Sequence, residues 1–219
     1  LKKNYINLLI DKIKKNIKIV IIFFTVFFLF FLFIQIYNYY NLNKIQKNSI
    51  SFFNTQNFND IDQINNAITN LSNEKNFYGI LSKLQLIQIN IDGKNYKDAI
   101  KLYVELLNNK SFDNIYKAAI ASKAAYQFID LNFTDLSIDY SETIENFISF
   151  IDDDLKDYQS IKLELKYLIK ILFIQMNKID YFNSRELQDM FNEIINSDVA
   201  TMAVKERIKK IHEFYSYKK

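Results

Sequence analysis

An uninterrupted apolar run near the N-terminus constrains this chain more than any other feature of its sequence. Residues 19–34 read IVIIFFTVFFLFFLFI, carry no charge, and include only Thr25 as a polar side chain. Extended to Tyr37, the run forms a helix that covers roughly 28 Å at about 1.5 Å per residue, which matches the hydrocarbon thickness of a bilayer. A helix that is apolar on all sides over this length is rare in a soluble domain. The run therefore predicts a transmembrane helix that contacts lipid through residues 19–37.

The charges on the two sides of this run differ. The lysines before it are Lys2, Lys3, Lys12, Lys14, Lys15 and Lys18, against the single Asp11. Only Lys44 and Lys47 follow closely, after a tyrosine cluster at positions 37, 39 and 40 that suits the headgroup level. Because basic segments stay in the cytoplasm, we expect residues 1–18 to be a cytoplasmic segment and the chain after residue 41 to lie across the membrane.

A cleaved signal peptide is the alternative interpretation of the run. Its apolar core is longer than that of a signal peptide, which usually has about 7 to 15 residues, and no small-residue cleavage site follows it. The sequence therefore favours an uncleaved signal anchor over residues 19–40. A polar spacer at residues 41–58 and a distal domain at residues 59–219 would follow.

The composition limits the chemistry of the distal part. Residues 1–47 hold eight lysines and one aspartate, whereas the remainder has a net charge of −4 and lacks the basic surface that nucleic-acid binding requires. The chain has no cysteine, which excludes disulfides and cysteine-ligated metals. Abundant Lys, Asn, Ile, Phe and Tyr indicate an AT-rich bacterial genome, so a lysine-rich stretch by itself carries little functional information.

The distal apolar residues recur at spacings of three and four, which predicts helices throughout. Helices are expected at about 59–73, 113–129 and 199–214, and further apolar stripes of helical spacing lie at 77–91, 96–107, 136–148, 161–176 and 187–195, with helix pairs that begin near residues 77, 113 and 157. Ser111 and Asn183 are candidate N-caps. Short connections predict antiparallel neighbours, so the fold class is all-α, with one transmembrane helix followed by a stack of helix hairpins. A compact single-core bundle is the alternative.

Alanine is concentrated in one segment. Five of the nine alanines occupy positions 118, 119, 121, 124 and 125. Small side chains on several faces of one helix let neighbouring helices approach closely. We therefore expect the helix at 113–129 to be central, with Ala118, Ala121 and Ala125 at its contacts.

The segment Gly93-Lys-Asn-Tyr96-Lys-Asp-Ala99-Ile-Lys-Leu-Tyr103 resembles the second half of a tetratricopeptide repeat. The resemblance implies a turn at Gly93 and an aromatic residue at Tyr96. It also implies a close helix contact at Ala99, with Tyr103 filling the adjacent space. Leu136-x-x-x-Tyr140 is a weaker match to the same pattern.

The wider layout is similar to the bacterial family of ancillary Sec-translocon subunits. Its landmarks here are the basic N-terminus, the membrane helix, the segment Phe77-Tyr78-Gly79-Ile-Leu-Ser-Lys-Leu and the alanine-rich helix. The resemblance implies an inner-membrane protein with a periplasmic tetratricopeptide-like domain. Its expected partners are translocon subunits, periplasmic chaperones or translocating polypeptides.

Candidate residues for catalysis or metal binding are few. His212 is the only histidine, and its polar surroundings in the sequence predict a solvated side chain rather than part of a catalytic relay. The run Asp152-Asp153-Asp154 lacks the ligand spacing of a calcium loop and suits the N-terminus of a helix. With only Gly79 and Gly93 as glycines, no glycine-rich phosphate loop is possible. We therefore expect a protein without enzymatic activity, cofactor or metal.

The sequence leaves three functions open. The first is a membrane-anchored interaction protein that assists translocation or chaperoning. The second is an envelope-assembly or division factor of the same architecture. The third reverses the membrane orientation and gives a cytoplasm-facing adaptor.

Overall fold

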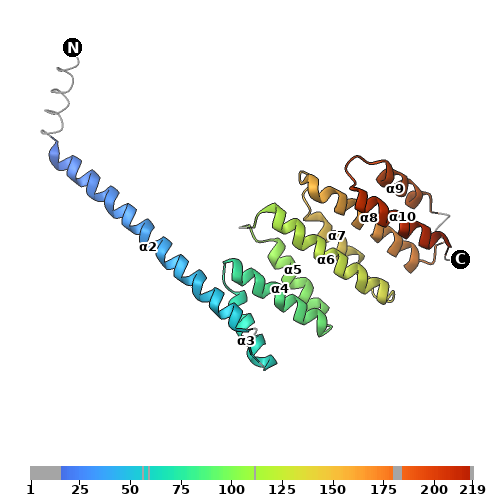
Figure 1. Ribbon diagram of the computed structural model, residues 1–219, viewed down its shortest axis with the longest axis horizontal. Coiled ribbons are helices and arrows are strands. Elements are labelled where there is room, and N and C mark those ends of the chain that lie inside the picture. Colours follow the sequence, from blue (N-terminus) through green and yellow to red (C-terminus); the bar gives the residue numbers. More distant parts are fainter. Residues whose placement is uncertain (1–15, 56, 59, 111, 180–183, 218–219) are drawn as a thin grey trace, which may run out of the picture. The chain divides into compact units, whose positions relative to one another are not determined.

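The computed structural model describes residues 16–217 except 56, 59, 111 and 180–183, and in this part all regular secondary structure is helical. The helices are α2 (Ile17–Thr55), α3 (Ile61–Ser72), α4 (Phe77–Asp92), α5 (Tyr96–Leu107), α6 (Asn114–Thr134), α7 (Ser141–Ser149), α8 (Lys156–Met176), α9 (Arg185–Asn196) and α10 (Met202–Tyr217). They form two compact units, and the boundary between the units lies between Ser82 and Lys83 (Figure 1).

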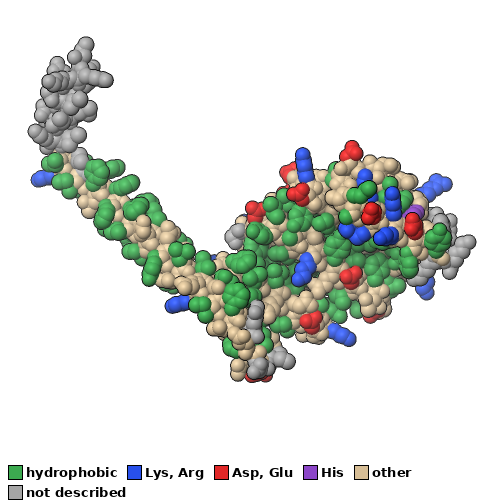
Figure 2. Space-filling model, viewed as in Figure 1, with side chains coloured by type: hydrophobic (Ala, Val, Ile, Leu, Met, Phe, Trp, Pro, Cys, Tyr) green, Lys and Arg blue, Asp and Glu red, His purple; other side chains and the backbone are tan. Residues whose placement is uncertain are grey.

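Helix α2 dominates the first unit. It is one helix of 39 residues, long and apolar enough to cross a membrane, and its hydrophobic side chains are exposed along the apolar run (Figure 2). The segment expected as a polar spacer, residues 41–58, continues this helix as far as Thr55. No glycine or proline interrupts residues 17–55, so nothing in the sequence ends the helix where its apolar character ends.

Helix α3 reverses direction and packs on α2. Asp60 caps α3, since its side chain accepts a hydrogen bond from the backbone N–H of Asp62 at 3.0 Å. At the other end of α3, Glu74 forms an ion pair with Lys44 of α2 at 2.7 Å. The connection between α3 and α4 therefore lies beside α2, about 30 residues back along the chain.

Gly79 permits this arrangement at the start of α4. A Cβ atom at position 79 would lie 1.9 Å from the carbonyl oxygen of Glu74, a distance that no side chain tolerates. The aromatic rings of Phe52 and Tyr78 lie 6.0 Å apart on either side of the same connection. The segment Phe77-Tyr78-Gly79 thus combines a close backbone approach with aromatic packing.

The second unit is a succession of packed helices. Helix α6 contacts α5, α7 and α8, and α8 contacts α7, α9 and α10, while α9 also contacts α10. Each helix therefore packs on its sequence neighbour, and α6, α8 and α10 also form a row (Figure 1). A buried core of Tyr167, Ile171, Leu187, Ile194 and Ile208, among others, joins the last three helices.

The alanine-rich segment lies in α6, which has helices on several sides. Ala118, Ala121, Ala124 and Ala125 are fully buried, whereas Ala119 is exposed. Ser122 is also buried, and its hydroxyl donates to the carbonyl oxygen of Ala118 at 2.7 Å. Small residues thus occupy the faces of α6 that other helices cover.

The helix expected at 136–148 begins later than predicted. Helix α7 starts at Ser141, and Leu136 is 42% exposed in the preceding turn, so Leu136-x-x-x-Tyr140 is not a helical pair. The cause is Asn132, which is fully buried in α6. Its amide donates to the carbonyl oxygen of Ile138, and its oxygen accepts from the backbone N–H of Tyr140 at 2.8 Å. These bonds stabilise a turn that a helix would have to break.

Two predicted N-caps, Ser111 and Asn183, lie outside the described residues. In the structure, Asp113 caps α6 by accepting from the backbone N–H of Ile115 at 3.0 Å. Ser184 caps α9 through the backbone N–H of Leu187. Both caps are side-chain oxygens that satisfy free N–H groups in the first helical turn.

Candidate functional site

The residues that resemble a tetratricopeptide repeat lie at the junction of α5 with its neighbours. Ala99 is fully buried and Tyr103 is 1% exposed. The hydroxyl of Tyr103 donates to Oε1 of Gln127 at 2.8 Å, and burial raises its pKa to about 12. The ring of Tyr96 lies edge-on to Phe128 at 6.5 Å. These side chains belong to the packing of helices rather than to an exposed site.

In the turn before α5, the residue with a left-handed backbone conformation is Lys94 rather than Gly93. Lys94 has a φ of 59°, whereas no described glycine has a positive φ. Gly93 instead relieves crowding, because a Cβ atom there would lie 3.3 Å from the carbonyl oxygen of Ile89. The expected turn therefore forms at Gly93, but for a different physical reason.

A polar network links one residue from each of α6, α8 and α10. Glu164 of α8 has a side chain only 3% exposed and accepts hydrogen bonds from Arg207 Nε at 2.7 Å and Arg207 Nη2 at 2.5 Å. Tyr126 of α6 donates its hydroxyl to the same carboxylate at 2.8 Å. Burial and the nearby carboxylate raise the pKa of Tyr126, and the hydrogen bond to Glu164 raises the pKa of Arg207. Glu164 thus links three helices through its hydrogen bonds to Tyr126 and Arg207.

The second unit has a groove between α7, α8 and α9, with a volume of about 540 Å³. It is called the α8 groove below. Its lining residues are Ser141, Glu145, Ile148, Ser149, Lys162, Lys166, Ile169, Lys170, Phe173, Glu186 and Met190. Apolar side chains and lysines thus share one concave surface.

Three lysines follow one side of α8 in this groove. Lys162, Lys166 and Lys170 are spaced by four residues, which places them on one face of a helix. Lys162 donates to the carbonyl oxygen of Ile151 at 2.7 Å and to Oδ1 of Asp153 at 2.6 Å. This hydrogen bond lowers the pKa of Asp153.

The other two lysines differ in their surroundings. Lys170 pairs with Glu186 and lies 5.2 Å from the ring centre of Phe173. Lys166 lies between the two paired lysines and is exposed. The groove therefore offers one accessible ammonium group beside the half-exposed ring of Phe173, which suits a partner with both acidic and apolar side chains.

The sequence interpretation did not identify the α8 groove. Its only sequence signal is the four-residue spacing Lys162-x-x-x-Lys166-x-x-x-Lys170. Because lysine is abundant throughout the chain, that row does not stand out without the packing of α7 and α9 against α8.

The acidic run Asp152-Asp153-Asp154 lies in the turn that precedes α8. Oδ2 of Asp152 accepts from the amide of Asn114 at 2.9 Å, and its Oδ1 accepts from the backbone N–H of Asp154 at 3.0 Å. Within the described residues, no group of three or more His, Cys, Asp or Glu side chains could hold a metal ion. The run therefore stabilises the turn and the adjacent helix ends.

His212 is not the solvated side chain that the sequence predicts. Its ring stacks on Phe191 with centroids 3.9 Å apart, and its Nδ1 lies 3.4 Å from the hydroxyl of the buried Tyr167. Burial lowers the pKa of His212. The physical reason is its spacing of four from Ile208, which puts it on the face of α10 that packs on α8 and α9.

The packed face of α10 is marked by Val204, Ile208 and His212, which are spaced by four residues. Met202, at the start of the helix, lies off this face and is 75% exposed.

Comparisons with protein-family models, curated proteins and solved structures give no match to this chain.

Proposed function

We propose that this chain is a single-pass bacterial inner-membrane protein whose distal helices bind polypeptide partners at the membrane, without catalysing a reaction. The observation that carries the proposal is the combination of an apolar helix of membrane-spanning length with the α8 groove in the second unit. The groove places the exposed Lys166 beside apolar side chains, which allows charge complementarity with an acidic, partly apolar polypeptide segment.

The order of helix contacts supports a tetratricopeptide-like stack of hairpins. In such a stack the first helix of each hairpin contacts its own partner and the first helix of the next hairpin. Among the described residues, α6 contacts α7 and α8, and α8 contacts α9 and α10. The links from α5 to α6, from α7 to α8 and from α9 to α10 complete the same pattern.

The uneven lysine distribution supports a cytoplasmic N-terminus and a periplasmic distal domain. A phosphatase that needs an oxidising compartment, fused after Lys219, should be active. An inactive phosphatase fusion together with an active cytoplasmic reporter at the same position would show the opposite orientation and favour the cytoplasm-facing adaptor.

The partner that fits the α8 groove is a polypeptide segment with acidic and apolar side chains. Partners held at the same membrane meet the anchored domain at a raised effective concentration, so a weak intrinsic affinity, about micromolar, is sufficient. By the family resemblance, translocon subunits, chaperones or emerging polypeptides supply such segments.

Photo-crosslinking in intact membranes tests the proposed surface. The variant Lys166→Glu reverses the charge of the accessible lysine, so it should reduce crosslinked product severalfold, because like charges repel across an interface. Lys123→Glu is the matched control, since Lys123 is equally exposed on α6 and does not line the groove. Equal crosslinking by both variants and the unmodified chain would exclude this groove.

The identity of the captured proteins separates the functions that the sequence leaves open. Translocon subunits or chaperones among the crosslinked products support assistance to translocation. Division or envelope-assembly proteins support the alternative function. Turnover of a small molecule by the purified chain would contradict the proposal altogether.

A further inference from the structure

A second hollow lies within the first unit, beside the C-terminal half of α2, and has a volume of about 310 Å³. It is called the interfacial pocket below. Helix α2 contributes Tyr37, Asn41, Lys44 and Ile45, and the connection from α3 to α4 contributes Glu74, Lys75 and Asn76. Residues almost 40 positions apart in the chain thus share one small cavity, in which apolar surface lies beside charged and amide groups.

The position of this pocket along α2 defines its depth relative to a membrane. Tyr37 ends the apolar stretch, so it marks the edge of the hydrocarbon layer if α2 spans the bilayer. At about 1.5 Å per residue, Asn41 lies about 6 Å and Lys44 about 10 Å beyond Tyr37. The headgroup layer on each side of a bilayer is about 5 to 8 Å thick. The pocket therefore spans the headgroups and their aqueous border.

Two lysines, two asparagines and a tyrosine supply hydrogen-bond donors to the lining. Lys44 pairs with Glu74 at 2.7 Å, which neutralises the one carboxylate in the pocket. Lys75 is exposed and adds a second ammonium group, so the pocket has a net positive charge. Oδ1 of Asn76 accepts from the backbone N–H groups of Tyr78 at 3.1 Å and Gly79 at 3.2 Å, which leaves its amide NH₂ as a donor.

An anion with several oxygen acceptors satisfies such a set of donors best, because charge-assisted hydrogen bonds to phosphate are among the strongest in proteins. At the depth of this pocket, the abundant group of that kind is the phosphate of a phospholipid. We propose that the interfacial pocket binds the headgroup phosphate of an anionic phospholipid and so holds the α3–α4 connection at the membrane surface. The proposal rests on the proposed function, because it requires α2 to span the bilayer.

The test compares lipid retention by the full chain reconstituted with equal amounts of phosphatidylglycerol and phosphatidylcholine. After extraction in mild detergent, native mass spectrometry measures which lipid stays bound. The unmodified chain should retain phosphatidylglycerol in preference. One basic residue near an anionic membrane surface changes affinity about fivefold, so Lys75→Gln should lower that preference by about this factor.

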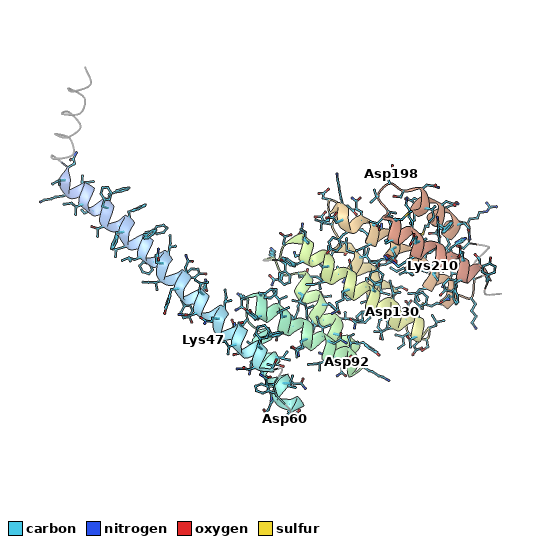
Figure 3. All side chains as sticks on the ribbon, viewed as in Figure 1. Lys47, Asp60, Asp92, Asp130, Asp198 and Lys210 are labelled. Atoms are coloured by element: carbon cyan, nitrogen blue, oxygen red, sulfur yellow. The ribbon has the colours of Figure 1, made fainter. Side chains whose placement is uncertain are left out.

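Lys47→Gln is the matched control. Lys47 lies on α2, three residues after Lys44, and does not line the pocket (Figure 3). The same loss of charge at this position should leave the preference for phosphatidylglycerol unchanged. Two results overturn the proposal: no preference in the unmodified chain, or an equal loss in Lys47→Gln and Lys75→Gln, which would indicate diffuse attraction to the surface.

A second measurement reports the depth of the connection directly. The chain has no cysteine, so Asn73→Cys carries a single fluorophore one residue before the pocket. Spin labels on lipid headgroups should quench that fluorophore strongly, and lack of quenching overturns the proposal. Alkaline carbonate extraction separates the two levels of failure. A chain that is extracted contradicts the proposed function, whereas an inserted chain that lacks lipid preference contradicts only the pocket.

Discussion

Removal of Arg207 should destabilise the second unit more than its half-exposed position on the surface implies. The side chain of Arg207 is 52% exposed, but the side chain of its partner Glu164 is only 3% exposed. Without Arg207, Glu164 keeps only the hydrogen bond from Tyr126. Truncation of one partner of a buried ion pair costs about 3 to 5 kcal/mol, because the other charge stays buried. Since water can enter from the exposed side of Arg207, we expect about 3 kcal/mol for Arg207→Met.

The double variant Arg207→Met/Glu164→Leu separates this penalty from lost packing. It leaves no unpaired buried charge, and replacement of a buried pair by apolar residues of similar size is often neutral. Glu164→Leu alone should cost about 1 kcal/mol, since Arg207 can turn to solvent. The two single costs sum to about 4 kcal/mol, so a near-neutral double variant should be about 4 kcal/mol more stable than that sum predicts.

Urea denaturation of the full chain in mild detergent gives the free energies of unfolding. The near-ultraviolet circular dichroism of its tyrosines monitors the transition. Lys210→Met is the matched control, because Lys210 is an exposed residue of the same helix (Figure 3). Its cost should stay within about 0.5 kcal/mol. If Arg207→Met costs no more than Lys210→Met, or if the two single costs simply add, the network does not hold the three helices together.

Three further variants test the packing of both units. Ala121→Leu should cost about 1 to 3 kcal/mol by overpacking the buried face of α6, whereas exposed Lys123→Ala should stay within about 0.5 kcal/mol; equal thermal melts would contradict the close approach at α6. Gly79→Ala should lower the melting temperature of the full chain, because its Cβ would lie 1.9 Å from the carbonyl oxygen of Glu74, and an unchanged melt would refute that contact. Burial lowers the pKa of His212 from its ordinary 6.5, so its contribution to stability is complete above that pH and is lost as the pH falls toward the lower folded-state pKa. His212→Phe should therefore lose less stability than the unmodified chain between about pH 7.5 and about pH 5, and equal losses in thermal melts would exclude this histidine as the cause.

Local sequence patterns were sufficient for the class and the sequence of elements. The apolar run predicts a helix of membrane-spanning length because composition and length alone decide that property. Helical periodicity predicts an all-helical distal part because each amphipathic stripe reports its own buried face. The expected bounds failed at residues 41–55, where α2 continues, and near residues 136–140, where the buried side chain of Asn132 stabilises a turn through bonds to residues six and eight positions away.

The tertiary structure alone decided which residues come together at the two hollows. The lysine row of α8 becomes a groove only because α7 and α9 border it. Glu164, Arg207 and Tyr126 are about 40 positions apart and carry no pattern that links them.

The segment after the apolar run shows the same limit most clearly. Its polar composition predicts a spacer between the membrane and the distal helices, but composition does not specify direction. In the structure, α2 continues to Thr55 and α3 reverses along it, which brings Glu74, Lys75 and Asn76 back to the level of Tyr37. The sequence by itself determined the helices and the position at which the apolar run of α2 ends, since both depend on neighbours in the chain. The return of the α3–α4 connection to that position depends on the Lys44–Glu74 pair and on the absence of a side chain at Gly79, contacts that exist only once the chain has folded.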